Sequence, residues 1–457
     1  MGDSEKTMSS QEFYTRGQDH ISRHRGEASG IILTRDQVAE YFGNRVFDEI
    51  ENYGSAIIPS SHEEPSRTLR EARESLGLTT SDLAKAINLD KSLVEKAEDQ
   101  NRRSNIRDIA KISQFLGIKD DIAIGTTSAI RDHSLGARLK SAKNATGSIY
   151  TANIVTKLSE AGWIISTQIS LMRKLGDEKK IPSAFSPDPN YGSHDEPTHV
   201  HAYRLAARTR EILGITRHKP IDSIRKILED SLGIPVVWSE LGSKIAGATV
   251  SSHGCRGIVL NNKFRDGDVN TFRFTMAHEL AHLLWDGDDF LENLVVDSFE
   301  SLKKLTSTTK PSKKHHFVEV RANAFAAEFL APRDAVFPIY SDHQRKTKNG
   351  ILAVMNEFGV GYHCAKHQIE NHMQGKIDDE KILDDEIDPD RLWAASENGS
   401  YATDLANIKL SRGSRFSDVV VKSLLKNIIT DNLASIYLDC TADDLKKVTR
   451  ILGETSL

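Results

Sequence analysis

Hydrophobic residues recur at helical spacing through most of the chain, and polar stretches without a period separate these segments. Residues 1–62 are polar, with one short amphipathic helix predicted in TRDQVAEYFGNRVFDEIENYG. A compact run of short helices follows over residues 67–118, and a helical connector over 119–178. Residues 179–201 are rich in proline and charge and show no period, which predicts a linker.

The second half of the chain mixes helices with a few short strands. AYRLAARTREILGI and IDSIRKILEDSLGI are expected to be helices that end at Gly214 and Gly233, because glycine readily adopts the conformation that closes a helix. IPVVW, IAGATV and RGIVLNN predict strands, and TMAHELAHLLWD and FVEVRANAFAAEFL predict two further helices. Residues 202–375 are therefore expected to form one domain, with an acidic linker and a helical region over 376–457. The predicted fold class is multidomain and mainly α, with a small β-sheet.

Composition adds few constraints. The 457 residues are enough for two to four domains, and a net charge of −5 gives no sign of bulk basicity. The three cysteines lie far apart and form no CxxC pair, which is typical of a reducing cytoplasm. No apolar run approaches the roughly 20 residues that span a bilayer, and the first residues lack an apolar signal segment. We expect a soluble cytoplasmic protein that does not bind membranes.

The segment HELAH carries the clearest candidate chemistry. His278 and His282 are four residues apart, so on a helix they share one face and can chelate one ion. Glu279 lies about 100° round the helix, beside the ion, where it can accept a proton from a water on the metal. Two histidines at this spacing also arise by chance on amphipathic helices, so the interpretation needs a third ligand.

The best source of a third ligand is the helix FVEVRANAFAAEFL. A carboxylate from Glu319 would complete a His₂Glu site and leave the fourth position of the metal open for water. Asn323, one turn later, is placed to orient His278 or His282. His315 and His316 are rival ligands, although they lie among lysines in an expected loop.

HELAH followed by ExxANxFAAEFLAP resembles the ImmA/IrrE family of bacterial metallopeptidases, as do the preceding TFRFTMAHELAH and YRLAARTREILGI. The similarity covers roughly residues 202–335 and continues more faintly over 358–372 and 416–450. It implies an α+β zincin-like domain with Zn²⁺ on His278, His282 and Glu319 and with Glu279 as general base. It also implies a protein substrate, because members of the family typically cleave a repressor or an associated regulator.

Several features of this domain stay open at the level of sequence. RGIVLNN is either an edge strand that pairs with an extended substrate or an interior strand. Cys255 is either a thiolate that reaches the metal or an ordinary small residue at a turn. The residue that stabilises the oxyanion has several unranked candidates, namely Tyr362, His363, His367, His372 and Arg321.

Residues 67–118 resemble the XRE (lambda-repressor-like) helix-turn-helix family. A helix capped at Thr79 or Thr80, a tight connection at Asn88-Leu89-Asp90 and a second helix in KSLVEKAED carry the resemblance. It implies DNA binding, normally as a dimer, with three residues of the second helix facing bases and two arginines near phosphates: Lys91, Ser92, Lys96, Arg102 and Arg103. The segment holds ten Lys/Arg and eight Asp/Glu, a net charge of only +2, so docking on a protein is the alternative.

Together these features predict a zinc-dependent endopeptidase that regulates transcription. It would do so by site-specific cleavage of a repressor or regulatory protein, itself or a partner, in a bacterial stress or phage/mobile-element response. The alternative is a non-proteolytic XRE-family regulator that uses the zinc-site domain as a sensor.

Overall fold

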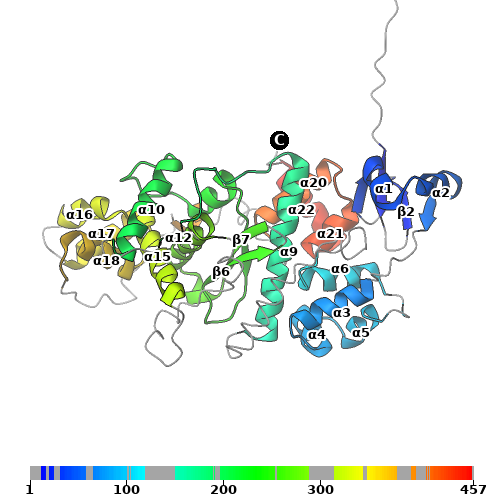
Figure 1. Cartoon of the computed structure of the whole chain (residues 1–457), viewed down its shortest axis with the longest axis horizontal. Helices are drawn as coiled ribbons and strands as arrows, with labels where there is room; N and C mark the ends of the chain where they lie inside the picture. The colour runs from blue at the N-terminus through cyan, green and yellow to red at the C-terminus, as the bar shows by residue number, and fades with distance from the viewer. Residues whose placement is uncertain are drawn as a thin grey trace, which may run out of the picture. The chain divides into compact units, whose positions relative to one another are not determined.

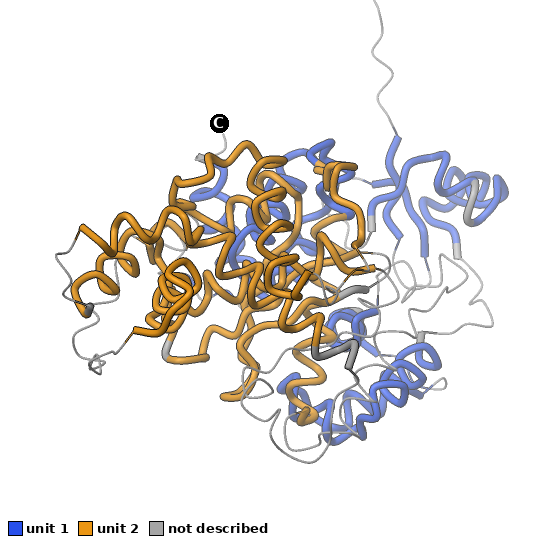
Figure 2. The backbone as a smooth tube through the Cα atoms, turned by 60° about the vertical axis from the view of Figure 1, so that its left-hand side comes forward, with its two compact units in different colours: residues 1–131, 170–177, 401–457 blue, residues 132–169, 178–400 orange. Residues whose placement is uncertain are grey.

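The computed structural model contains several helical bodies and two small sheets (Figure 1). It describes residues 12–16, 20–24, 31–57, 65–99, 102, 104–118, 150–188, 190, 196–252, 255–287, 313–342, 347–377, 393–397, 408, 410 and 412–454. Most of the expected connector and acidic linker, and Arg103, lie outside these residues. The chain divides into two compact units, residues 1–131, 170–177 and 401–457 (unit 1) and residues 132–169 and 178–400 (unit 2) (Figure 2). None of the described helices is long and apolar enough to cross a membrane.

Unit 1 begins with a small antiparallel sheet and two helices. The sheet has the order β3-β1-β2-β4. Its elements are β1 (Phe13–Arg16), β2 (His20–Arg23), β3 (Ile31–Thr34), α1 (Arg35–Phe42), α2 (Arg45–Tyr53) and β4 (Ser55–Ile57). The sequence predicted one helix here, and the structure divides it at Gly43, which has a φ of 77°. The strands were not predicted because three or four residues are too few to show a period of two.

Four short helices follow, α3 (Pro65–Ser75), α4 (Thr80–Ile87), α5 (Lys91–Ala97) and α6 (Ile106–Phe115). Thr79, one of the two predicted caps, closes the start of α4 in a reciprocal pair with Asp82. Asn88, the first residue of the predicted tight connection, ends this helix in the left-handed conformation. A buried ion pair between Arg73 Nε and Glu98 Oε1, 2.7 Å apart, joins α3 to the residue after α5.

The C-terminal helices are α20 (Arg415–Leu425), α21 (Asp431–Leu438) and α22 (Ala442–Glu454). α21 repeats the geometry of α4: both have eight residues, a threonine cap, and a left-handed residue at the start of a three-residue connection. The buried Arg412 links this segment to α6, because it donates to Gln114 Oε1 (2.7 Å) and to the carbonyl of Tyr437 (3.0 Å). The repeat is one of backbone geometry, which a search for similar residues does not reveal.

Unit 2 holds the three-stranded sheet β5-β7-β6 among helices. Its strands are β5 (Val236–Ser239), β6 (Gly247–Ser252) and β7 (Cys255–Asn261). Its helices are α9 (Ala152–Leu175, of which 152–169 belong to this unit), α10 (Thr198–Ile212), α11 (Ile224–Lys226), the π-helical turn η1 (Ile227–Ser231), the 3₁₀ turn η2 (Phe264–Gly267), α12 (Val269–Trp285), α15 (Lys313–Leu330), α16 (Arg333–Asp342), α17 (Thr347–Phe358) and α18 (Tyr362–Met373). β7 pairs in parallel with β5 and antiparallel with β6, so RGIVLNN forms the central strand and β6 an edge strand.

The two faces of this sheet contact different helices. A Cβ on Gly257 would lie 2.7 Å from the side chain of Ile165 in α9, and a Cβ on Gly247 would lie 2.6 Å from that of Thr275 in α12. The register places these two glycines on opposite faces, since Gly257 pairs with Val250 and Gly247 with Leu260. Both approaches therefore require glycine, and the sheet is packed between α9 and α12.

A buried charge network fixes the start of α12. Arg273 and Glu397 form an ion pair in which both side chains are at most 2 % exposed. The Glu397 carboxylate also accepts from Ser223 Oγ and from the amides of Ile224 and Arg225, so it caps the N-terminus of α11. The residues around Glu397, beyond the expected acidic linker, thus belong to the core of unit 2.

We predict that Glu397→Ala strongly destabilises unit 2. The change leaves Arg273 buried without its carboxylate and α11 without its cap, which together correspond to about 3–5 kcal/mol of unfolding free energy. Tryptophan fluorescence during urea unfolding measures this unit selectively, because all four tryptophans of the chain lie within it. Glu240→Ala, which removes an exposed pair to Lys263 at 3.9 Å, is the control and should change little. Equal midpoints for the two variants would contradict the role of Glu397.

Candidate metal centre

Helix α12 carries the HELAH segment and is buried on every side. Asp268 caps its first turn by accepting from the amides of Asn270 and Thr271. Its apolar residues, such as Met276 and Leu280, are buried, but so are His278, Glu279 and His282. The surrounding elements are α15, β6 and β7, which all contact α12 (Figure 1). The polar groups of this helix must therefore find partners inside the protein.

The side chains of His278, His282 and Glu319 converge on one point. The Nε2 atoms of the two histidines are 3.0 Å apart. His278 Nε2 lies 3.4 Å from Glu319 Oε2, and His282 Nε2 lies 3.8 Å from Glu319 Oε1. Each of these three side chains offers one potential metal-ligand atom, and the three atoms all lie within 4.8 Å of one another. No other such group of His, Cys, Asp or Glu side chains occurs among the described residues. The structure thus brings together the three residues that the sequence proposed as metal ligands.

The outer nitrogen of each imidazole faces an acceptor. His278 Nδ1 lies 3.1 Å from Asn323 Oδ1, and His282 Nδ1 lies 2.6 Å from Asp286 Oδ2. A neutral imidazole has one N–H, and these partners place it on Nδ1, so each Nε2 directs a lone pair toward Glu319. Converging lone pairs and a carboxylate repel one another unless a cation lies among them.

Two further observations show that these residues fit a cation. The Oε2 atom of Glu319 is buried and receives no hydrogen bond from any described residue, as expected of an atom that a metal would satisfy. Burial lowers the pKa of His282, but the hydrogen bond to Asp286 and the charges of Glu319 and Asp286 outweigh it and raise the pKa above its ordinary value. The site therefore attracts positive charge, and two imidazoles with one carboxylate suit a divalent ion such as zinc.

The sequence did not identify Asp286 as a functional residue. It lies four residues after His282, so both fall on one helix face, and this spacing was the available signal. Its other carboxylate oxygen, Oδ1, pairs with Arg321. Arg321 Nη1 also donates to the backbone carbonyls of Asp188 (2.5 Å) and Asn190 (2.9 Å). Arg321 was a candidate for the oxyanion, and the structure instead places it behind His282.

Part of the expected linker supports this arrangement. The ring of Phe185 packs edge-on against Trp285, with ring centroids 5.7 Å apart, and the amide of Asp188 donates to the carbonyl of Trp285 at 2.8 Å. The Asp188 carboxylate also lies 3.3 Å from Nε2 of the fully buried His201. These contacts anchor a segment without periodicity to the end of α12, which no pattern in its own residues predicted.

Glu279 lies in the same helix but points to the sheet. Its side chain is fully buried, and Oε2 accepts a hydrogen bond of 2.6 Å from Thr249 Oγ1 in β6. Glu279 thus follows His278 in the sequence, but β6 holds its carboxylate, whereas α15 holds the imidazole of His278. Thr249 is a second residue that the sequence did not single out.

The remaining candidates of the peptidase region are engaged elsewhere. His367 is exposed and lies 3.4 Å from Glu370, while His372 stacks on Phe337. The rings of Tyr362 and His363 contact each other, with centroids 5.4 Å apart. Cys255 begins β7 and does not belong to the group of potential metal ligands. His315 and His316 fall in the first turn of α15 rather than in a loop, and their side chains lie outside the described part of the structure.

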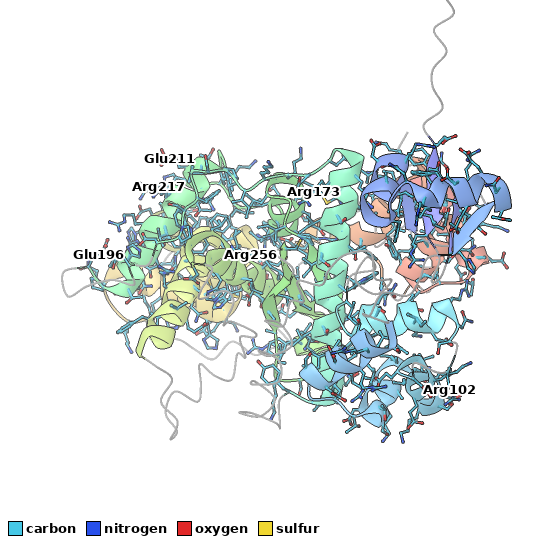
Figure 3. The ribbon with its side chains drawn as sticks, turned by 45° about the vertical axis from the view of Figure 1, so that its right-hand side comes forward. Arg102, Arg173, Glu196, Glu211, Arg217 and Arg256 are labelled. Atoms are coloured by element: carbon cyan, nitrogen blue, oxygen red, sulfur yellow. The ribbon has the colours of Figure 1, made fainter. Side chains whose placement is uncertain are left out.

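The residues expected to contact DNA lie at α5 and just beyond it. Lys91 and Ser92 are exposed in the first turn of α5, and Lys96 is half-buried. Lys91 Nζ lies 2.9 Å from the Glu95 carboxylate, so part of its charge is neutralised. Arg102, labelled in Figure 3, is exposed, whereas Arg103 is not among the described residues.

Comparison with known proteins identifies one region. Residues 229–370 match the family model Peptidase_M78, the IrrE N-terminal-like domain. This range includes α12, all three strands of the sheet and α15, and therefore all of the converging residues. The match indicates a metallopeptidase of the ImmA/IrrE type. No curated protein and no solved structure matches the chain significantly.

We predict that Asp286→Asn weakens metal binding at this centre. The amide cannot both accept from His282 and neutralise Arg321, so the imidazole loses its fixed orientation, and the zinc dissociation constant should rise about 10- to 100-fold. Competition with a chromophoric chelator measures this constant. Asp268→Asn is the matched control, because asparagine caps a helix as well as aspartate and lies at the other end of α12. Unchanged affinity in Asp286→Asn would refute the role of Asp286.

Proposed function

We propose that the protein is a zinc-dependent endopeptidase that regulates transcription by site-specific cleavage of a repressor or regulatory protein, itself or a partner. The observation that carries this proposal is the convergence of His278, His282 and Glu319, together with the buried Glu279 that follows His278 in the sequence. Three protein ligands would be typical of a catalytic zinc site, whereas structural zinc sites usually have four. The match of residues 229–370 to a metallopeptidase model supports the same conclusion.

The proposed reaction assigns distinct roles to the residues. A zinc ion held by His278, His282 and Glu319 would supply Lewis acidity for the hydrolysis. Glu279 is the general base that takes the proton from the attacking water and later gives it to the leaving amine. Its hydrogen bond to Thr249 holds one carboxylate oxygen and so orients the other. Asn323 and Asp286 keep both imidazoles in the tautomer that binds a metal.

An extended peptide is the substrate form that suits this domain. β7 occupies the middle of the sheet, so the edge-strand role considered for RGIVLNN passes to β6. Pairing with a strand edge fixes the substrate backbone through main-chain hydrogen bonds, independently of its side chains. β6 carries Thr249, the partner of Glu279, and therefore lies beside the base.

The proposed link to transcription rests on α3–α6. The capped helix α4, the left-handed Asn88 and the exposed first turn of α5 favour a helix-turn-helix of the XRE type. In this interpretation Lys91, Ser92 and Lys96 face bases, and Arg102 and Arg103 approach phosphates. Stress or phage infection would provide the signal that triggers cleavage.

Two substitutions in the metal centre should separate binding from catalysis. Glu319→Ala removes a ligand, so we expect purified protein to lose most of its zinc. Glu279→Gln should keep zinc and abolish cleavage, because the amide cannot accept the proton. Elemental analysis measures the metal, and Glu357→Ala, on an exposed position of α17, is the control. Equal zinc loss in both site variants would overturn the assignment of roles.

Cleavage itself is measured by comparing new protein N-termini in cells that express the wild type or Glu279→Gln, with and without DNA damage. A cut made only by the wild type identifies a signalling protease and its substrate. No difference under either condition, with zinc retained, would favour the alternative of a non-proteolytic XRE-family regulator that uses this domain as a sensor.

The helix-turn-helix proposal has its own test. Lys91→Ala and Lys96→Ala should each weaken binding to duplexes that the wild type selects from a random-sequence pool, by about tenfold. Lys85→Ala, an exposed lysine on α4, is the matched control and should bind like the wild type. Failure of the wild type to enrich any duplex would favour docking on a protein instead.

A further inference from the structure

Thr249 lies where the edge strand meets the base. Along β6, alternate side chains face opposite sides of the sheet, and the close approach of Gly247 to Thr275 identifies the side that faces α12. Thr249 is two residues from Gly247 and shares this face. The whole residue, backbone included, is 1 % exposed, and its hydroxyl donates to Glu279 Oε2 at 2.6 Å.

The backbone of Thr249 faces the other way within the plane of the sheet. The amide of Asn261 donates to the carbonyl of Ala246 at 2.9 Å, so Ala246 is a hydrogen-bonded partner of β7. In an antiparallel pair such residues alternate along the strand, so Ala248 and Val250 also bond to β7. The N–H and C=O groups of Gly247 and Thr249 therefore point away from β7, toward the edge where a further strand would pair.

We infer that Thr249 is a positioning residue that ties the general base to the edge strand. Its hydroxyl holds Glu279 in the orientation that reaches the attacking water. The inference rests on the proposed peptidase function and specifies how β6 serves it. A short, charge-assisted hydrogen bond between two buried groups fixes the carboxylate far better than packing alone.

Three variants test the hydroxyl without altering the backbone. Thr249→Val replaces it by a methyl group of similar size, and Thr249→Ser restores it. Thr275→Val is the matched control, since its hydroxyl bonds to the carbonyl of Thr271 within α12 and not to Glu279. The zinc-loaded proteins are assayed on a proteome-derived peptide library, and then on the best-cleaved peptide from it.

We expect Thr249→Val to lower kcat by about 10- to 100-fold, because a base displaced by a fraction of an ångström transfers the proton poorly. KM should stay within about twofold, since the hydroxyl holds the base and not the substrate. Thr249→Ser should recover most of the activity, and Thr275→Val should match the wild type. An unchanged kcat in Thr249→Val, a loss confined to KM, or a failure of serine to rescue would each overturn the inference.

A second readout does not depend on cleavage. The infrared difference spectrum between the wild type and Glu279→Gln identifies the carboxyl band of Glu279. This band should shift in Thr249→Val, return in Thr249→Ser and stay in place in Thr275→Val, because its frequency responds to hydrogen bonding. If no peptide is cut, the proposed reaction fails while the spectrum still decides whether Thr249 holds Glu279. An unshifted band in Thr249→Val would overturn the contact itself.

Discussion

The need to pair every charged group of one buried helix organises the peptidase region. α12 is enclosed on all sides, yet it contains Arg273, His278, Glu279 and His282. An ion left unpaired in such surroundings costs several kcal/mol, so each group needs a partner from another element. The partners come from the residues around Glu397, from Asn323 in α15, from Thr249 in β6 and from Asp286 with Arg321. The side chains of the candidate metal centre are therefore held by contacts from α15 and from the end of α12.

The same constraint explains why segments distant from HELAH belong to the site. The backbone carbonyls of Asp188 and Asn190 bind Arg321, which in turn neutralises Asp286. This chain of contacts sets the tautomer and orientation of His282 from a stretch of sequence that has no helical or strand pattern. The geometry of the candidate metal centre thus depends on residues outside the group of potential ligands.

Unit 1 shows how one local geometry can recur without similar residues. α4 and α21 share a threonine cap, a length of eight residues and a left-handed residue that starts the connection to the next helix. The first turn of α5 carries the exposed Lys91, whereas that of α22 carries Asp443 and Asp444. The first turns of the two helices therefore differ in charge although the preceding helix and connection share one geometry.

The sequence by itself determined what local spacing encodes. Histidines four apart, a carboxylate helix after them, the cap at Thr79 and the turn at Asn88 each depend on neighbours within one or two helical turns, and the structure contains all of them. Tertiary structure alone decided the rest. It made β7 the central strand and β6 the edge, because strand order depends on packing against α9 and α12 rather than on the composition of a strand. It also recruited Thr249, Asp286 and Glu397, since the partner of a buried charge is set by distance in space, and thirty residues of sequence separate Thr249 from Glu279.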